Sequence, residues 1–223
     1  MIKTELQKLV RTIHQGISDE HFLENLRRVL KSKVVDMPSL ISKLRDIKNN
    51  LKSSDTATDM ATEIKAASQF CGIPCLNSIS FGEKPDIRIK IEPHNLSVEV
   101  KRFRFRGEDV VDTQRLANYN GILQHYGNPE CVQNQIERVL QKKAREYTGQ
   151  DPFFIYLWSD SACQVENSEI ICAARSIGGV IGGRLLGVFY KWAAYPRNLI
   201  LLESSPLTND IRQLLEPKFK VLT

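Results

Sequence analysis

The most constraining feature of this chain is a pair of alternating stretches joined by a short polar segment, KPDIRIKIEPHNLSVEVKRFRFRG, residues 84–107. In the first stretch three isoleucines alternate with charged residues. In the second stretch two valines alternate with Glu99 and Lys101. A two-residue period is typical of β-strands, whose successive side chains point to opposite faces. The pattern therefore predicts a β-hairpin with one aliphatic face and one charged face.

The register of this hairpin decides which charged side chains meet. If the turn is centred on residues 93–95, Asp86 lies opposite Lys101. The same register places Arg88 opposite Glu99 and makes Asp86 and Glu99 diagonal neighbours, with backbones roughly 7–8 Å apart. A slip of one residue would turn Asp86 toward the isoleucines, so burial of the aliphatic face enforces this parity.

Two carboxylates and a lysine on one hairpin face suit a divalent cation and an anionic substrate. Mg²⁺ is bound by one or two carboxylates, keeps several waters and takes phosphate oxygens as further ligands. Such an ion lowers the pKa of a bound water, and a neighbouring ammonium stabilises developing negative charge. A surface hairpin with two cross-strand ion pairs explains the same residues without any chemistry.

A further acidic residue lies on the helix predicted over residues 56–71, which Gly72 ends. Apolar residues at helical spacing form one stripe on this helix, and Glu63 falls at its edge. Glu63 is therefore aimed partly inward. A rim residue whose stem covers apolar surface would occupy the same position.

Residues 85–86 (Pro-Asp), twelve intervening residues and residues 99–101 (Glu-Val-Lys) resemble the PD-(D/E)xK motif of the restriction-endonuclease-like nuclease superfamily. Glu63 resembles the helical acidic residue that many members carry before the motif. The resemblance covers roughly residues 55–160. It implies an α/β fold with a restriction-endonuclease-like core, in which helices flank a central mixed sheet.

The same resemblance implies a Mg²⁺-dependent DNA endonuclease, with Mn²⁺ as a substitute ion. Asp86, Glu99 and the backbone carbonyl of Val100 would bind the metal. Lys101 would be the catalytic lysine, and Glu63 an auxiliary acidic residue for a metal or its water. We expect a type II restriction-like or phage-defence enzyme. A repair or recombination nuclease and a non-cleaving nucleic-acid-binding module are the alternatives.

Polar residues that flank the motif are candidates for contacts with DNA. In residues 101–107 three arginines alternate with phenylalanines, and the helix predicted over residues 131–147 carries a lysine inside its apolar stripe. A twisted edge strand and a lysine that extends past the core explain these patterns as well. The candidate nucleic-acid-binding residues are Arg102, Arg104, Arg106, Lys143 and Gln135.

The remaining pattern predicts a helical extension over residues 1–53, for dimerisation or DNA contact, and a nuclease core over residues 54–223. Helices are expected near residues 113–125, 168–177 and 209–219, and strands at PFFIYLWS and NLILLES. The Gly-rich passage SIGGVIGGRLLG lacks the Lys-Ser/Thr of a phosphate-binding loop, so we expect turns or close packing there.

Composition bounds the class of protein. The 223 residues are 42% hydrophobic and carry a formal net charge of +5, which favours an anionic partner without proving one. No apolar run reaches the roughly 20 residues of a membrane span, and the N-terminus lacks the apolar core of a signal peptide. We therefore expect a cytoplasmic protein without membrane association, and a homodimer if it cuts both strands.

The five cysteines are scattered, with no metal-binding spacing. Free cysteine is among the most buried residue types. We expect them to be reduced and to lie in the core.

Overall fold

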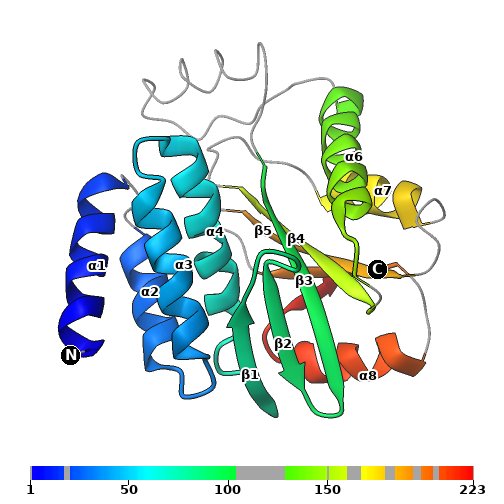
Figure 1. Ribbon diagram of the computed structural model, residues 1–223. Helices are drawn as coiled ribbons and strands as arrows, with labels where there is room; N and C mark the ends of the chain where they lie inside the picture. The colour runs from blue at the N-terminus through cyan, green and yellow to red at the C-terminus, as the bar shows by residue number, and fades with distance from the viewer. Residues whose placement is uncertain are drawn as a thin grey trace, which may run out of the picture. The chain divides into compact units, whose positions relative to one another are not determined.

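The computed structural model describes residues 2–17, 21–103, 129–149, 151–159, 167–178, 184–192, 197–202 and 206–222 (Figure 1). Its strands form one mixed sheet of seven, in the order β1-β2-β3-β4-β5-β6-β7, with helices flanking it. The α/β class and the mixed sheet expected from the sequence are confirmed. The chain divides into two compact units, Met1–Val100 and Lys101–Thr223.

Four helices open the first unit. They are α1 (Ile2–Gly16), α2 (Phe22–Lys31), α3 (Met37–Asn49) and α4 (Ser54–Phe70). The carboxylate of Asp36 caps α3 by accepting a hydrogen bond from the Ser39 backbone N–H at 2.9 Å, and Pro38 follows the cap, where its missing N–H costs nothing. α4 ends before Gly72, whose φ of 82° is a conformation that favours glycine. The helices predicted over residues 1–53 and 56–71 are confirmed.

Helix α4 is buried on every side along residues 61–70, because it packs against both α2 and α3 (Figure 1). Its polar side chains therefore need partners inside the protein. Ser68 and Gln69 both donate hydrogen bonds to the side-chain oxygen of Asn25 on α2. The expectation that Glu63 is aimed partly inward is confirmed by its burial, but it does not lie at the edge of a single stripe, because no face of residues 61–70 is left exposed.

Three antiparallel strands complete the first unit: β1 (Leu76–Phe81), β2 (Ile87–Ile91) and β3 (His94–Arg102), whose last two residues enter the second unit. The sequence analysis did not predict β1. The segment before α3 holds this strand in place, since Asp36 N–H donates to the Ile79 carbonyl and Ile79 N–H donates to the Val34 carbonyl, each at 2.8 Å.

The β2-β3 hairpin has the predicted parity and a different register. Ile87 lies opposite Val98 and Ile91 opposite His94, so the turn consists of Glu92 and Pro93. The three isoleucines are buried and the residues between them are exposed, as predicted. The pairing of Asp86 with Lys101 and of Arg88 with Glu99 is wrong by two residues. Ser97 is the residue opposite Arg88.

The second unit combines helices and strands around a buried centre. Its elements are α6 (Pro129–Glu146), β4 (Phe153–Ser159), α7 (Asn167–Gly178), β5 (Leu185–Trp192), β6 (Asn198–Leu201), α8 (Pro206–Leu215) and β7 (Lys220–Leu222). β4 pairs in parallel with β5, β5 antiparallel with β6, and β6 in parallel with β7. Every residue of β4 is buried, which explains its unbroken apolar sequence.

Most elements of this unit match the sequence prediction. The helices at α6, α7 and α8 and the strands β4 and β6 are confirmed. The Gly-rich passage was expected to form turns or close packing. Its last residues begin β5, and the close packing is found at Gly187. β7 was also not predicted. The helix expected near residues 113–125 lies outside the described residues.

The compact units divide at residues 100 and 101, whereas the sequence analysis divides the chain at residues 53 and 54. α3 contacts both α4 and β1, so the N-terminal helices share a unit with the hairpin. Within the described ranges, no helix is both long enough and apolar enough to span a bilayer.

For the three cysteines that can be described, the predicted reduced state is confirmed and the predicted core location is wrong. Cys75 and Cys172 are exposed and Cys71 is half-buried.

Gly187 tests the pairing of β5 with β6. A Cβ at this position would lie 2.5 Å from the Ile200 carbonyl oxygen, a backbone atom that cannot move without breaking the pairing. We expect Gly187→Ala to lower the free energy of unfolding by roughly 1–3 kcal/mol, measured by urea denaturation.

Gly178, the last residue of α7, provides the matched control. A Cβ there would meet only Leu202 side-chain atoms at 3.7 Å or more. Gly178→Ala should leave stability unchanged or raise it by about 0.4–1 kcal/mol. Equal effects of the two substitutions would contradict the described packing of β5.

Candidate functional site

Asp86 lies directly before β2, and its side chain takes the place of a strand partner. β2 begins only at Ile87, which pairs with Val98, so Val100 on β3 has no partner residue within β2. The Val100 N–H instead donates a hydrogen bond to Asp86 Oδ2 at 2.7 Å. A hydrogen bond to a carboxylate is short and strong compared with a neutral one. This contact orients the Asp86 carboxylate, whose residue is only 8% exposed.

Glu99 lies beside Asp86 on the neighbouring strand. Extended one step beyond the Ile87–Val98 pair, the same register would bring Asp86 opposite Glu99, in place of the diagonal placement that the sequence analysis expected. Glu99 is only 2% exposed. Two carboxylates in neighbouring buried positions repel each other when both are charged, so the site favours a positive charge between them.

The reading of the hairpin as a surface element is disfavoured by burial. Asp86 and Glu99 are almost fully shielded from solvent, whereas Arg88 and Lys90 on the same face are exposed. Arg88 donates a hydrogen bond to the Lys84 carbonyl at 3.0 Å. The charged face therefore has a buried acidic end and an exposed basic end.

Val100 and Lys101 follow Glu99 on β3. Val100 is buried and uses its N–H to hold Asp86. Lys101 is half-buried, and strand parity gives its side chain the same facing as that of Glu99. The hairpin thus brings together Asp86, Glu99 and Val100, with Lys101 next along the strand.

Glu63 is held by a lysine that the sequence analysis did not identify. Glu63 Oε2 lies 2.6 Å from Lys43 Nζ, and both side chains are about nine-tenths buried. Lys43 also donates a hydrogen bond to the Gly82 carbonyl at 3.2 Å. A signal was present in the sequence: Lys43 stands within the apolar stripe of α3, one residue before Leu44 and four before Ile47, where a solvated lysine does not belong.

The Lys43–Glu63 pair connects α3 and α4 to the loop that carries Asp86. Lys43 holds the Gly82 carbonyl, and the Gly82 N–H donates to the Asp86 carbonyl at 3.1 Å. This loop is tight at Gly82, where a Cβ would lie 2.9 Å from the Pro85 carbonyl oxygen. A buried ion pair on two helices therefore positions residues 82–86, and through them the Asp86 backbone.

The donor set suits a hard cation with few protein ligands. Among the side chains that the structure describes, no group of three or more His, Cys, Asp or Glu residues gathers closely enough to hold a metal ion. Glu63 therefore does not join Asp86 and Glu99 in such a group. Two carboxylates still match Mg²⁺, which is commonly bound by one or two carboxylates and completes its shell with waters and phosphate oxygens.

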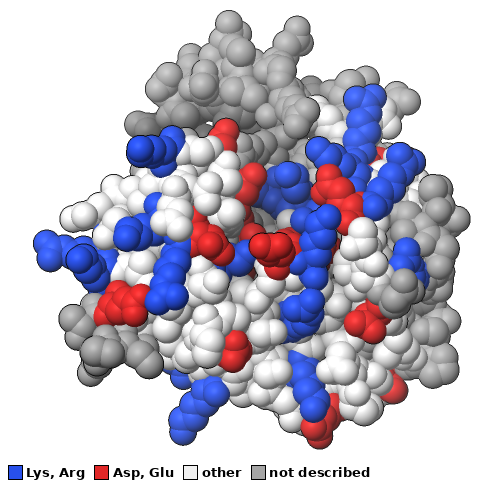
Figure 2. Space-filling model, in the orientation of Figure 1, with Lys and Arg blue, Asp and Glu red and all other residues white. Residues whose placement is uncertain are grey.

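The candidate nucleic-acid-binding residues are only partly described. Arg102 on β3 is half-buried, as are Gln135 and Lys143 on α6. Arg104 and Arg106 lie outside the described residues. On the face shown in Figure 2, basic and acidic side chains are interspersed, and the described surface there shows no continuous basic field.

Lys191 on β5 is a second lysine with an unusual environment. Burial lowers its pKa from the ordinary lysine value, and the nearby charge of Arg197 lowers the pKa further. Nothing in the sequence around Lys191 indicated this. It belongs to the second unit, as Lys101 does, whereas Asp86, Glu99 and Val100 belong to the first.

Comparisons with protein-family models, with curated proteins and with solved structures give no match to this chain.

The Lys43–Glu63 pair can be tested by removing the cation. Lys43→Met leaves a buried carboxylate without its partner, and we expect the free energy of unfolding to fall by roughly 3–5 kcal/mol. Urea denaturation at neutral pH provides the measurement. A double variant, Lys43→Met with Glu63→Met, should recover much of the loss, because neither charge of the pair then remains.

Lys48→Met is the matched control, since Lys48 is exposed on the same helix. It should change stability by no more than about 0.5 kcal/mol. A Lys43→Met variant as stable as Lys48→Met would show that the ion pair does not hold the loop.

Proposed function

We propose that the β2-β3 hairpin forms the active site of a Mg²⁺-dependent DNA endonuclease with a restriction-endonuclease-like core. The observation that carries this proposal is the buried cross-strand pair of Asp86 and Glu99, with the Val100 N–H oriented onto Asp86. Shielding two carboxylates from water is costly unless a positive charge compensates them. A divalent cation supplies that charge, and Lys101 follows on the same strand.

Each residue has a defined part in this proposal. Asp86 and Glu99 hold the cation, together with the Val100 carbonyl. The bound Mg²⁺ would supply an activated water and polarise the scissile phosphate. Lys101 presents its ammonium to the negative charge that develops on the phosphate oxygens. Glu63 acts at a distance, by fixing Lys43 and thereby the loop before Asp86, and is a positioning residue in this account.

The type of DNA substrate follows from the cleavage pattern. A type II restriction-like or phage-defence enzyme would produce discrete plasmid fragments. A repair or recombination nuclease would prefer branched, nicked or single-stranded DNA. Binding of DNA without any cleavage would favour a non-cleaving module that keeps the fold.

The activity test uses purified protein with plasmid, linear, single-stranded and branched DNA in Mg²⁺, Mn²⁺ or EDTA. We expect cleavage only with a divalent cation. Asp86→Asn, Glu99→Gln and Lys101→Met should each slow cleavage by at least about 100-fold, because each removes a charge that acts on the metal or the transition state.

Lys90→Gln is the matched control, because Lys90 is exposed on the same hairpin face. It should cleave at close to the wild-type rate. Circular dichroism and thermal unfolding establish that each variant is folded, and calorimetric titration with Mn²⁺ measures metal binding apart from catalysis. Cleavage that persists in folded Asp86→Asn protein would contradict the proposal.

A further inference from the structure

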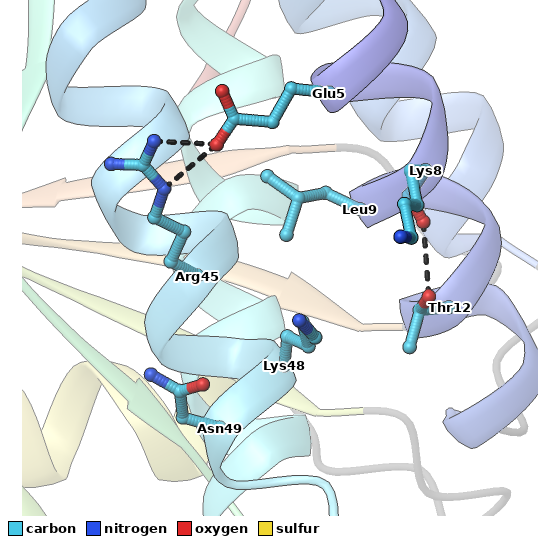
Figure 3. Close-up of a pocket in the computed structure, with 7 residues that line it drawn as sticks. All are labelled: Glu5, Lys8, Leu9, Thr12, Arg45, Lys48 and Asn49. Carbon is cyan, nitrogen blue, oxygen red and sulfur yellow. Dashed lines mark hydrogen bonds and ion pairs between the residues drawn. The ribbon is translucent and has the colours of Figure 1, made fainter.

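A cleft of about 290 Å³ separates α1 from α3 within the first unit (Figure 3). Its walls come from about two turns of α1 and a little more than one turn of α3. The lining residues are Glu5, Lys8, Leu9 and Thr12 on α1, and Arg45, Lys48 and Asn49 on α3. Leu9 is buried and provides the apolar floor, since it is only 7% exposed.

The charges around this cleft do not balance. Arg45 is paired with Glu5, through Nη2 at 2.5 Å and Nε at 3.2 Å. Lys8 and Lys48 face each other across the cleft in Figure 3. Within the part of the chain that the structure describes, neither ammonium has an ion-pair or hydrogen-bond partner. With one acid against three bases, the lining keeps two positive charges.

We propose that this cleft binds a phosphate group. The two ammonium groups and the guanidinium line one cleft from two helices, and the two uncompensated charges match a dianionic phosphate better than a carboxylate, which would leave one positive charge uncompensated. The Thr12 hydroxyl is not a further donor, because it already donates to the Lys8 carbonyl at 3.0 Å.

Glu5 gives the proposal its sharpest consequence. The Glu5 carboxylate accepts hydrogen bonds from Arg45 Nε and Nη2. An entering phosphate would compete with Glu5 for these two donors. Both side chains are about half exposed, and exposed ion pairs of this kind contribute little stability. Removing the Glu5 charge should therefore strengthen phosphate binding, whereas removing either lysine should weaken it.

Lys48 could instead serve only to stabilise α3, and a binding test separates that role from phosphate binding. It lies in the last turn of α3, where a cation interacts favourably with the helix dipole. That role predicts a small loss of stability in Lys48→Gln and no effect on phosphate affinity. It makes no prediction for Glu5→Gln.

The test is calorimetric titration of the Asp86→Asn protein at low salt, with three probes: inorganic phosphate, a nucleoside triphosphate and a short DNA duplex. Using Asp86→Asn prevents hydrolysis, so the result does not depend on the proposed nuclease activity. We expect Lys8→Gln and Lys48→Gln each to weaken binding about three- to tenfold, and Glu5→Gln to tighten it at least about twofold.

The control is Lys33→Gln, which removes one exposed lysine in the turn before α3, outside the cleft. It should leave the affinity within about twofold, because Lys33 does not line the cleft and would make no direct contact with a phosphate there. Binding of all three probes identifies a general phosphate site, and binding of the duplex alone identifies a contact to the DNA backbone. Failure of every probe to bind, equal losses in Lys33→Gln and Lys8→Gln, or weaker binding in Glu5→Gln would each overturn the proposal.

Discussion

The hydrogen bond from the Val100 backbone to the Asp86 carboxylate is the contact on which the candidate site depends. It closes the open end of the β2-β3 ladder, orients a buried carboxylate and keeps it beside Glu99. The burial of both acids gives this contact its significance. A protein that needed only a stable hairpin would place apolar side chains there, because buried carboxylates must be compensated by hydrogen bonds or positive charge. We propose that a divalent cation is part of that compensation.

The sequence was a reliable guide to the parity of the hairpin and a poor guide to its register. Alternation of isoleucine with charged residues requires that Asp86 and Glu99 share a face, and any even shift satisfies that requirement. The register depends on where along the chain the turn lies. The turn was expected to be centred on residues 93–95, whereas Ile91 already pairs with His94, so the turn lies one residue earlier. In the observed register Lys101 is no longer opposite Asp86, as was predicted. Glu99 takes that position instead when the register is extended by one residue.

The features that the sequence did not predict all depend on contacts between segments that are distant in the sequence. β1 is short and mixed in composition, and its place depends on hydrogen bonds from the segment before α3. β5 begins within a Gly-rich passage, where Gly187 permits the close approach of the Ile200 carbonyl. Glu63 was placed at the edge of an apolar stripe on α4. No pattern within the α4 sequence shows that other helices pack against α4 on more than one side. The sequence carries one sign of the buried ion pair, which is the charge of Lys43 inside the apolar stripe of α3. Its partner Glu63 lies twenty residues later, on α4.

The central claim is that Asp86 and Glu99 together bind a divalent cation, and paramagnetic relaxation tests it without relying on catalysis. Mn²⁺ is added in substoichiometric amounts to ¹⁵N-labelled protein, and the broadening of each backbone amide signal is recorded. The account predicts that Val100 and Ile87, the residue after Asp86, broaden first, while Glu92 in the turn stays sharp, and that Glu99→Gln removes the effect. Broadening centred on other acidic residues, or the same broadening at Val100 in Glu99→Gln, would contradict it.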